Sequence, residues 1–292
     1  MGRSGKAAEP SMEGKTCVVT GGTSGIGRIA AEALARRGAR VILVGRSDER
    51  GAAAIRGIWE ATGSRNLDFL RADLSSQADV RKLANQIIDG VPRLDVLINN
   101  AGSIFVTRQE SADGIEMTWA LNHLSYFLLT DLLLPLLKSN ESARIVNVAS
   151  SAHKGAVLDF DDIQAAKGRY RLFRQYQRSK LANILFTYEL ARRLEGTRVT
   201  ANTLHPGFVK TNIVNQEGFF GMIFRLGAQL AAITPEEGAK TTIHLASSPE
   251  VADISGRYFY KERPSTSSPE SQDAKTAERL WRLSEEMTGI AG

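Results

Sequence analysis

The sequence predicts an α/β fold: a doubly wound parallel sheet flanked by helices on both faces. Short runs rich in β-branched residues alternate with longer segments of helical periodicity, as in proteins built from strand–helix–strand units. The predicted strands hold consecutive apolar residues instead of a strict alternation, which is typical of strands covered on both faces. A glycine-rich turn over Gly21–Gly27 separates the first predicted strand from the first predicted helix.

Six segments are predicted to be strands. The first, TCVVT, is typical because Val and Thr favour extended backbone. The helical segments between the strands make them parallel, with right-handed crossovers. In chain order the predicted strands are Thr16–Thr20, Arg40–Val44, Leu67–Leu70, Val96–Ile98, Arg144–Val148 and Val199–Leu204.

The segments between these strands carry apolar residues at helical spacing. A further helix is expected within residues 275–288, where Leu280, Trp281 and Leu283 could dock on the core. The predicted helices are Gly27–Arg37, Asp48–Thr62, Gln77–Ile88, Ile115–Lys138, Tyr176–Leu194 and Thr276–Met287.

The length of 292 residues suits one large domain or two small ones. Because we find no internal repeat and no linker, we predict one domain over residues 13–292 behind a flexible tail of residues 1–12. Two regions depart from the strand–helix rhythm. Pro264–Ala274 is polar and rich in Pro and Ser, which predicts a loop, and Asn212–Ile233 is apolar and aromatic.

Composition and charge indicate which partners the protein binds and in which cellular compartment it resides. The net charge is +5 without a dominant block of Lys and Arg, so we expect no nucleic acid as partner. The basic segment Arg169–Arg178 interleaves aromatics, which can also mark nucleic-acid binding. The single cysteine, Cys17, lies in an apolar run and is expected to be a buried hydrophobe in a reducing compartment.

We also expect neither a membrane-inserted segment nor a bound metal ion. The first fifteen residues contain no apolar stretch, which argues against a secretory signal or an N-terminal anchor. No uncharged apolar run reaches the ~18–20 residues of a membrane span. We therefore expect a cytoplasmic protein without stable membrane insertion. The four histidines show no metal-ligand spacing, so we predict no metal.

Gly21, Gly25 and Gly27 predict a site for a dinucleotide. Glycine permits a tight turn and a close approach of backbone N–H groups to a pyrophosphate, and the following helix points its positive end at the same charge. The spacing G-x-x-x-G-x-G differs from the more familiar G-x-G-x-x-G. A turn without a ligand is the alternative, and the position between strand and helix favours the binding site.

Arg46 follows the second predicted strand and bears on the choice of cofactor. An acidic residue near this point would bind a ribose 2′-hydroxyl, whereas the planar fork of an arginine can grip a 2′-phosphate. The sequence therefore predicts NADP(H) over NAD(H). An arginine exposed on the surface without a ligand is the alternative interpretation.

Tyr176 and Lys180 are four residues apart and share one face of a predicted helix. The pKa of a phenol is about 10, and a nearby ammonium and a cationic nicotinamide ring are expected to lower it. Tyr176 would then be a general acid for reduction of a carbonyl and a general base for oxidation of an alcohol. By itself the pattern Y-x-x-x-K is common by chance.

Two further polar residues support this interpretation. Ser150 follows an apolar strand, at the edge where such sheets bind ligands, and can donate to a substrate oxygen. The neighbouring Ser151 is a competitor that spacing does not separate from it. Asn122 is a polar residue within an apolar helix, and an asparagine that only bonds locally is the alternative. His153 is interpreted as a loop histidine with a structural hydrogen bond rather than as a second proton donor.

These motifs, in this order, resemble the short-chain dehydrogenase/reductase family over essentially the whole chain. The family's TGxxxGxG falls on Thr20–Gly27, its NNAG on Asn99–Gly102 and its PG on Pro206 and Gly207. The resemblance implies a single-domain Rossmann-type fold. Within the family the chain looks most like the retinol dehydrogenase branch, through runs such as RIVNVASSAHK and LHPGFVKTNI.

The resemblance also assigns roles to residues. The catalytic tetrad falls on Asn122, Ser150, Tyr176 and Lys180, and alignment on the flanking Val-Asn-Val and Ala-His places the serine's role on Ser150. In the family mechanism, Asn122 holds a water that links Lys180 to solvent, and Lys180 binds the nicotinamide ribose. The resemblance also gives most arginines of Arg169–Arg178 an exposed position on the approach to the site. The residues expected to bind NADP are Gly21, Thr23, Ser24, Gly25, Ile26, Gly27, Arg46, Asp73, Leu74, Asn100, Ala101, Gly102, Tyr176, Lys180, Pro206, Gly207, Val209 and Thr211.

The substrate and the assembly are expected from the same resemblance. Asn212–Ile233 lies where the family places its substrate-binding loop, so we expect an apolar lid over a small hydrophobic alcohol, aldehyde or ketone; a core helix and an interfacial membrane helix are the rivals. The family often dimerises through the equivalents of Ile115–Lys138 and Tyr176–Leu194, so we expect a homodimer or a higher homo-oligomer. A catalytically silent NADP(H)-binding regulator or scaffold is the alternative function, and the presence of Tyr176 and Lys180 favours an enzyme.

Overall fold

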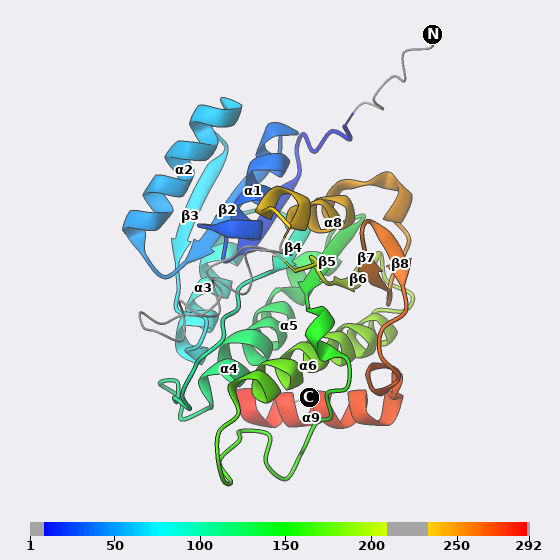
Figure 1. The fold of residues 1–292 in the computed structure, drawn as a ribbon. Coiled ribbons are helices and arrows are strands. Elements are labelled where there is room, and N and C mark those ends of the chain that lie inside the picture. Colours follow the sequence, from blue (N-terminus) through cyan, green and yellow to red (C-terminus); the bar gives the residue numbers. More distant parts are fainter. Residues whose placement is uncertain (1–8, 209–232, 291–292) are drawn as a thin grey trace.

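The apolar, β-branched runs form the centre of one sheet in a computed structural model, which describes residues 9–208 and 233–290 (Figure 1). Within these ranges the sheet has eight strands in the order β3-β2-β1-β4-β5-β6-β7-β8. All neighbouring pairs are parallel except β7 and β8. The strands are β1 (Thr16–Thr20), β2 (Arg40–Gly45), β3 (Leu67–Arg71), β4 (Val96–Asn99), β5 (Ala143–Val148), β6 (Val199–Leu204), β7 (Tyr258–Tyr260) and β8 (Arg263–Ser265). The predicted fold class is confirmed.

The order of the strands reverses direction at the centre of the sheet. β1 pairs on one side with β2, where Thr20 lies opposite Val44, and on the other side with β4, where Val19 lies opposite Ile98. Chain connections leave in opposite directions from this point, so the carboxyl ends of β1 and β4 open onto a shared crevice. The two glycine-containing motifs of the sequence follow these two strands.

Helices cover both faces of the sheet (Figure 1). Two apolar clusters, one on each face, show the layers: the first packs α3 and α5 on the sheet, and the second packs α1 and α8 on it. The helices of one layer are α1 (Gly25–Arg36), α2 (Asp48–Thr62) and α8 (Pro235–Ser247). Those of the other are α3 (Gln77–Gly90), α4 (Met117–Trp119), α5 (Ser125–Lys138) and α6 (Leu172–Arg193), with α9 (Ala274–Thr288) outside α6.

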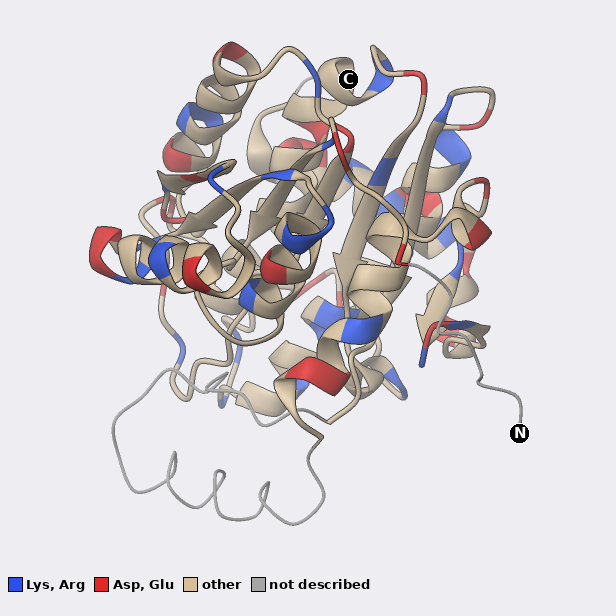
Figure 2. Cartoon of the chain, turned by 90° about the horizontal axis from the view of Figure 1, so that it is seen from above, with Lys and Arg blue, Asp and Glu red and all other residues tan. Residues whose placement is uncertain are grey.

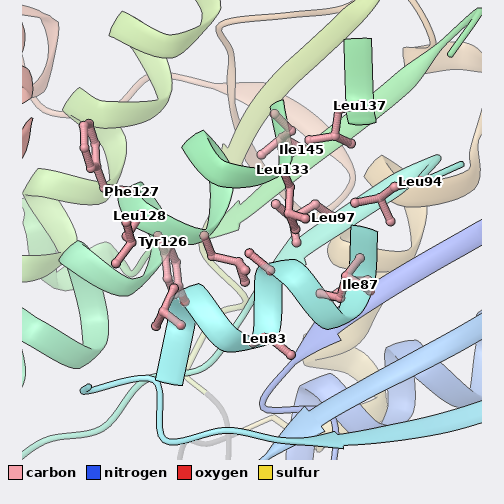
Figure 3. Close-up of a cluster of buried hydrophobic side chains, with 14 of the residues drawn as sticks. Leu83, Ile87, Leu94, Leu97, Tyr126, Phe127, Leu128, Leu133, Leu137 and Ile145 are labelled. Atoms are coloured by element: carbon pink, nitrogen blue, oxygen red, sulfur yellow. The ribbon is translucent and has the colours of Figure 1, made fainter. Parts of the chain in front are cut away.

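The first cluster is the larger part of the core, and its side chains interdigitate between the helices and the sheet (Figure 3). Leucines of α3 and α5 meet Leu97 and Ile145 of the central strands. The completely buried Cys17 lies in the second cluster, and burial raises the pKa of its thiol. The prediction that this cysteine is a buried hydrophobe is therefore confirmed.

Two predictions of local structure were incomplete or wrong. The predicted helix Ile115–Lys138 is divided into α4, a π-helical turn over Ala120–Leu124, and α5. The predicted loop Pro264–Ala274 contains the end of β8 and a 3-10 turn over Pro269–Gln272. Pro264 is tolerated in a strand there because β8 is the edge of the sheet.

Helix α8 and strand β7 were not predicted. The start of α8 has a signal in the sequence, since Thr234 precedes Pro235 and its hydroxyl accepts a hydrogen bond from the backbone N–H of Glu237. Thr-Pro-Glu-Glu is a favourable beginning for a helix. β7 is three residues long, which is too short for periodicity to indicate.

Helix α9 docks on the core through Trp281, as predicted. The indole stacks on Phe186 of α6 at 5.8 Å between ring centroids and meets Phe127 of α5 edge-on at 5.0 Å. The carboxyl end of α9 is held by α3, because the amide of Gln77 donates to the carbonyl of Met287 at 2.7 Å and Arg81 donates to the following carbonyl. Helix α9 thus covers part of the α5–α6 surface on which a dimer was expected.

Two further features of the fold are the distribution of charged residues and one long apolar helical stretch. In the view of Figure 2, positions of Lys and Arg are interspersed with positions of Asp and Glu along the described elements. Among the described residues, the helical stretch Met117–Lys138 is long and apolar enough for a membrane span by length and composition. It contains Asp131, and 72% of its most apolar window is buried inside the protein, which is the pattern of a core helix.

Candidate active site

The glycine-rich turn leaves β1 and enters α1 in a conformation that only glycine suits. Gly21 and Gly25 have φ angles of 64° and 53°, in the left-handed region. A Cβ atom on Gly27 would lie 2.4 Å from the carbonyl oxygen of Gly21. Ser24 precedes α1 without a side-chain cap, so the first N–H groups of the helix face the turn as donors for an anion. The turn therefore fits the pyrophosphate of a dinucleotide.

The second glycine-containing motif is bonded directly to the first. The side-chain amide of Asn100 donates to the carbonyl of Thr20 at 2.9 Å, and the backbone N–H of Asn100 donates to the Thr20 hydroxyl at 2.8 Å. The N–H of Ala101 donates to the same hydroxyl at 3.1 Å. These bonds join the carboxyl ends of β1 and β4, where the sequence placed cofactor-binding residues.

Asn122 and Lys180 converge on Gly102. A Cβ atom on Gly102 would lie 3.2 Å from Oδ1 of Asn122 and 3.4 Å from Nζ of Lys180. Asn122 is completely buried, and its amide both accepts from the N–H of Ser103 at 2.9 Å and donates to its carbonyl at 3.0 Å. The ammonium of Lys180 donates to the carbonyl of Val148 at 3.2 Å. The π-helical turn that carries Asn122 is thus tied to the residue after the NNAG motif, and such turns are frequent at functional sites.

Tyr176 and Ser150 complete the group. The Tyr176 side chain is 7% exposed, and the side chain of Ser150 is near enough to the phenol to act on its pKa. The Lys180 ammonium lies 5.7 Å from the centre of the Tyr176 ring. Ser151 is exposed, so the structure pairs Ser150 with the phenol, as alignment on the flanking residues implied. All four tetrad residues are therefore brought together.

The pKa values of the two titratable groups are shifted by burial. Burial raises the pKa of the Tyr176 phenol, and the hydrogen bond from Ser150 opposes this rise. Burial lowers the pKa of Lys180 to about 8. The protein's own groups therefore raise the pKa of Tyr176, whereas the sequence led us to expect a fall. Desolvation of the phenolate outweighs the stabilisation that these groups give it. The protein alone keeps this phenol protonated, as a general acid requires.

The remaining residues that are predicted to bind the cofactor differ in their exposure and in the groups that they contact. Thr23 packs on Gly45, because a Cβ atom placed on Gly45 would lie 2.9 Å from the methyl group of Thr23. Arg46 is exposed directly after β2. The Asp73 carboxylate accepts from the N–H and hydroxyl of Ser75 at 3.0 and 2.7 Å, and Leu74 points into the core, which leaves its backbone for a ligand.

The end of β6 leads to Pro206 and Gly207, and Gly207 has a φ of 92°. Val209 and Thr211 lie outside the described residues, as does the expected lid apart from its last residue, Ile233. Among the described residues, no group of three or more His, Cys, Asp and Glu could hold a metal ion.

Comparison with known proteins decides the family. Residues 15–218 match the family described as short chain dehydrogenase. The chain belongs to this family. Human retinol dehydrogenase 14 is 43% identical over 295 residues, which cover 96% of this chain and 88% of that protein. The similarity to the retinol dehydrogenase branch that the sequence indicated is confirmed.

Solved structures of other proteins have the same fold. An uncharacterized protein from Mycobacterium paratuberculosis superposes with a TM-score of 0.78 at 34% identity, covering 97% of this chain and 96% of that one. A short chain dehydrogenase from Escherichia coli CFT073, complexed with NADPH, gives a TM-score of 0.67 at 27% identity, covering 86% and 98% of the two chains.

Glu116 was missed by sequence reasoning, although it binds to the start of α6, the helix that carries Tyr176. Its buried carboxylate accepts from the N–H of Trp119 at 2.8 Å, from the hydroxyl of Tyr170 at 3.0 Å and from the amide of Gln175 at 2.9 Å. Gln175 precedes Tyr176 in α6. Its cap of α4 is local, but its bonds to Tyr170 and Gln175 join residues that lie 54 and 59 positions away, and no local pattern signals them.

Most arginines of the segment Arg169–Arg178 are exposed, as the resemblance implied, and Arg178 is the exception. Arg169, Arg171 and Arg174 are exposed, but Arg178 is 4% exposed. Its guanidinium donates to the carbonyl of Val157 and to other groups of residues 159–162. Arg178 therefore fixes the segment that leads from the serine to α6.

The serine assignment makes a direct prediction. Ser150→Ala removes the hydroxyl beside the Tyr176 phenol, so kcat is expected to fall about tenfold to a thousandfold, whereas Ser151→Ala removes an exposed hydroxyl and keeps kcat within about twofold. Steady-state kinetics with NADPH and an aldehyde compare the two variants. Equal losses, or a larger loss for Ser151→Ala, would contradict the assignment.

Proposed function

We propose that this short-chain dehydrogenase is an NADP(H)-dependent oxidoreductase that interconverts a hydrophobic alcohol and its aldehyde or ketone. The observation that carries the proposal is the convergence of four side chains: Lys180 and Asn122 meet at Gly102, the Lys180 ammonium lies 5.7 Å from the centre of the Tyr176 ring, and Ser150 is near enough to the phenol to oppose the rise in its pKa. A buried phenol, a hydroxyl donor and an ammonium at the carboxyl edge of such a sheet suit proton transfer to or from a substrate oxygen. The retinol dehydrogenase relative supports an apolar substrate.

Each tetrad residue has a distinct part in this proposal. On reduction, the Tyr176 hydroxyl gives its proton to the substrate oxygen, and on oxidation the phenolate takes it back. The hydroxyl of Ser150 donates a hydrogen bond to the same oxygen as negative charge develops on it. Lys180 favours the phenolate by its charge, and Asn122 orders the polar groups beside Lys180.

The cofactor would be held by residues at the carboxyl edge of the sheet. The turn Gly21–Gly27 would bind the pyrophosphate, Asp73 the adenine side, and Lys180 and Gly207 the nicotinamide side. When bound, the nicotinamide supplies or accepts the hydride. The NADPH complex of the Escherichia coli structure supports NADP(H) as the cofactor, and the exposed Arg46 supports the same choice, because its guanidinium is available to a 2′-phosphate.

Arg46→Asp tests the preference for NADP(H). The change replaces a charge-assisted hydrogen bond with repulsion, so the ratio of kcat/KM for NADPH to that for NADH is expected to fall about 10- to 100-fold. The matched control is Arg65→Asp, because Arg65 is also exposed but precedes the amino end of β3, whereas Arg46 follows the carboxyl end of β2. An unchanged ratio in Arg46→Asp, or an equal fall in the control, would refute the assignment.

The alternative is a catalytically silent NADP(H)-binding regulator or scaffold. Loss of NADPH absorbance in the presence of a panel of aldehydes and ketones decides between the two functions. Turnover of at least one apolar carbonyl is the expected result. Tight NADPH binding without turnover of any member of the panel would favour the regulator.

We further propose a cytoplasmic location and assembly as a homodimer or a higher homo-oligomer. A single buried thiol, Cys17, supports a reducing compartment. Helix α9 packs on Phe127 and Phe186 of the predicted interface helices, so a dimer that uses this part of α5 and α6 requires α9 to be displaced. Other parts of the surface can pair without this cost.

A further inference from the structure

His153 lies three residues after Ser150 and closes the short turn that follows β5. The turn is a 3-10 helix over Ser151–His153, and the imidazole is completely buried. Nδ1 of the ring lies 2.6 Å from the carbonyl oxygen of Ser150. Nε2 lies 3.0 Å from the backbone N of Ser268, 115 residues away in the chain. Both ring nitrogens are therefore used by backbone groups.

These two partners fix the state of the ring. A carbonyl can only accept, so Nδ1 of His153 carries the proton, and a backbone N–H can only donate, so Nε2 presents its lone pair to Ser268. The ring is neutral in this arrangement, since a proton on Nε2 would face another donor. Burial also lowers the pKa of His153. The imidazole thus has no proton or lone pair left for a substrate, as expected of a structural histidine.

The His153 ring restrains the backbone of Ser150, the residue beside the Tyr176 phenol. The Ser150 carbonyl accepts from Nδ1 and also from the backbone N–H of His153 at 3.2 Å. The imidazole meets the Tyr258 ring edge-on at 5.2 Å. The residue before Ser268 is tied to α6, because the hydroxyls of Ser267 and Tyr188 are 2.8 Å apart. The chain of contacts therefore runs from Ser150 through His153 to the helix that carries the phenol.

We propose that His153 is a positioning residue: its Nδ1–H holds the Ser150 backbone so that the serine hydroxyl faces Tyr176 and the substrate oxygen. The inference rests on the proposed function, because it concerns the serine of that mechanism. Small displacements of a catalytic hydroxyl lower turnover strongly, so a bond to the backbone of Ser150 can control kcat without touching substrate or cofactor.

Two substitutions separate positioning from simple structural support. In His153→Asn the side-chain amide reaches the place of Nδ1 and can donate to Ser150, but the N–H of Ser268 loses its acceptor. In His153→Gln the longer side chain reaches the place of Nε2 and can accept from Ser268, but the donor to Ser150 is lost. The proposal predicts that His153→Gln lowers kcat about tenfold to a hundredfold with KM for NADPH within about twofold. It predicts that His153→Asn keeps kcat within about threefold of wild type and lowers the melting temperature more than His153→Gln does.

The outcomes are distinct. A normal kcat in folded His153→Gln, or losses of kcat that follow the melting temperature in both variants, would overturn the positioning role. If His153→Gln fails to fold, His153→Asn alone decides, since a large loss of kcat in this donor-retaining variant contradicts the proposal. Wild-type protein is measured in parallel with the carbonyl panel, and its inactivity would refute the proposed function instead.

Discussion

Replacing Tyr176 with phenylalanine is expected to lower kcat by about 10²–10⁴-fold, the usual contribution of a general acid or base. The ring is buried and keeps its packing in the variant, whereas the hydroxyl proposed to exchange a proton with the substrate oxygen is removed. Lys180 sits 5.7 Å from the ring centre and bonds the Val148 carbonyl, so its position does not depend on the hydroxyl. Binding of NADPH is therefore expected to change by no more than about threefold.

The experiment measures kcat by NADPH consumption and the Kd of NADPH by fluorescence titration. Tyr260→Phe is the matched control, because Tyr260 is a partly buried tyrosine of β7 that stacks on His205 and has no part in the proposed proton transfer. Near-normal turnover of Tyr176→Phe would remove the central role from the phenol. A loss of turnover that is matched by a loss of NADPH binding would indicate a structural defect instead.

Gly27→Ala is expected to abolish measurable binding of NADPH and to destabilise the fold. The new Cβ would lie 2.4 Å from the carbonyl oxygen of Gly21 and 2.5 Å from the side-chain amide of Asn100. The first of these is backbone, so the turn itself must shift, and overpacking of this kind costs about 1–3 kcal/mol of the free energy of unfolding. The shift also moves the N–H groups that face the phosphates.

Thermal unfolding and NADPH titration test this prediction. Gly90→Ala is the control, because Gly90 ends α3, and a Cβ there would have nothing within 4 Å. The control is expected to bind NADPH normally and to be at least as stable as the wild type. Wild-type affinity in Gly27→Ala would show that the turn is not the phosphate cradle.

Much of the fold could be predicted because the local signals agree with the tertiary structure. The bounds of Thr16–Thr20, Val199–Leu204 and Asp48–Thr62 are the same in the sequence prediction and in the structure. The helix Asp48–Thr62 is stopped by Gly63, whose φ of 72° suits only glycine well. The π-helical turn at Asn122 could not be predicted, because its amide bonds the backbone of Ser103, nineteen residues away, and no local pattern records that contact.

The members of the candidate site could be predicted better than their surroundings. The four tetrad residues meet as their motifs implied, but the direction of the Tyr176 pKa shift depends on burial, which a motif does not reveal. The burial of Arg178, unlike the exposure of the other arginines in its segment, was hidden for the same reason. The anchoring of His153 by the Ser268 backbone involves segments far apart in the chain, and no local pattern records such a contact.

The position of α9 has a consequence for biosynthesis. Phe127 and Phe186 are synthesised long before Trp281, yet Trp281 covers their outer surface. During translation the nascent polypeptide therefore cannot complete this layer until residue 288 has left the ribosome. A premature stop codon ahead of Trp281 would spare every residue of the tetrad and still expose an aromatic surface that chaperones and proteases recognise.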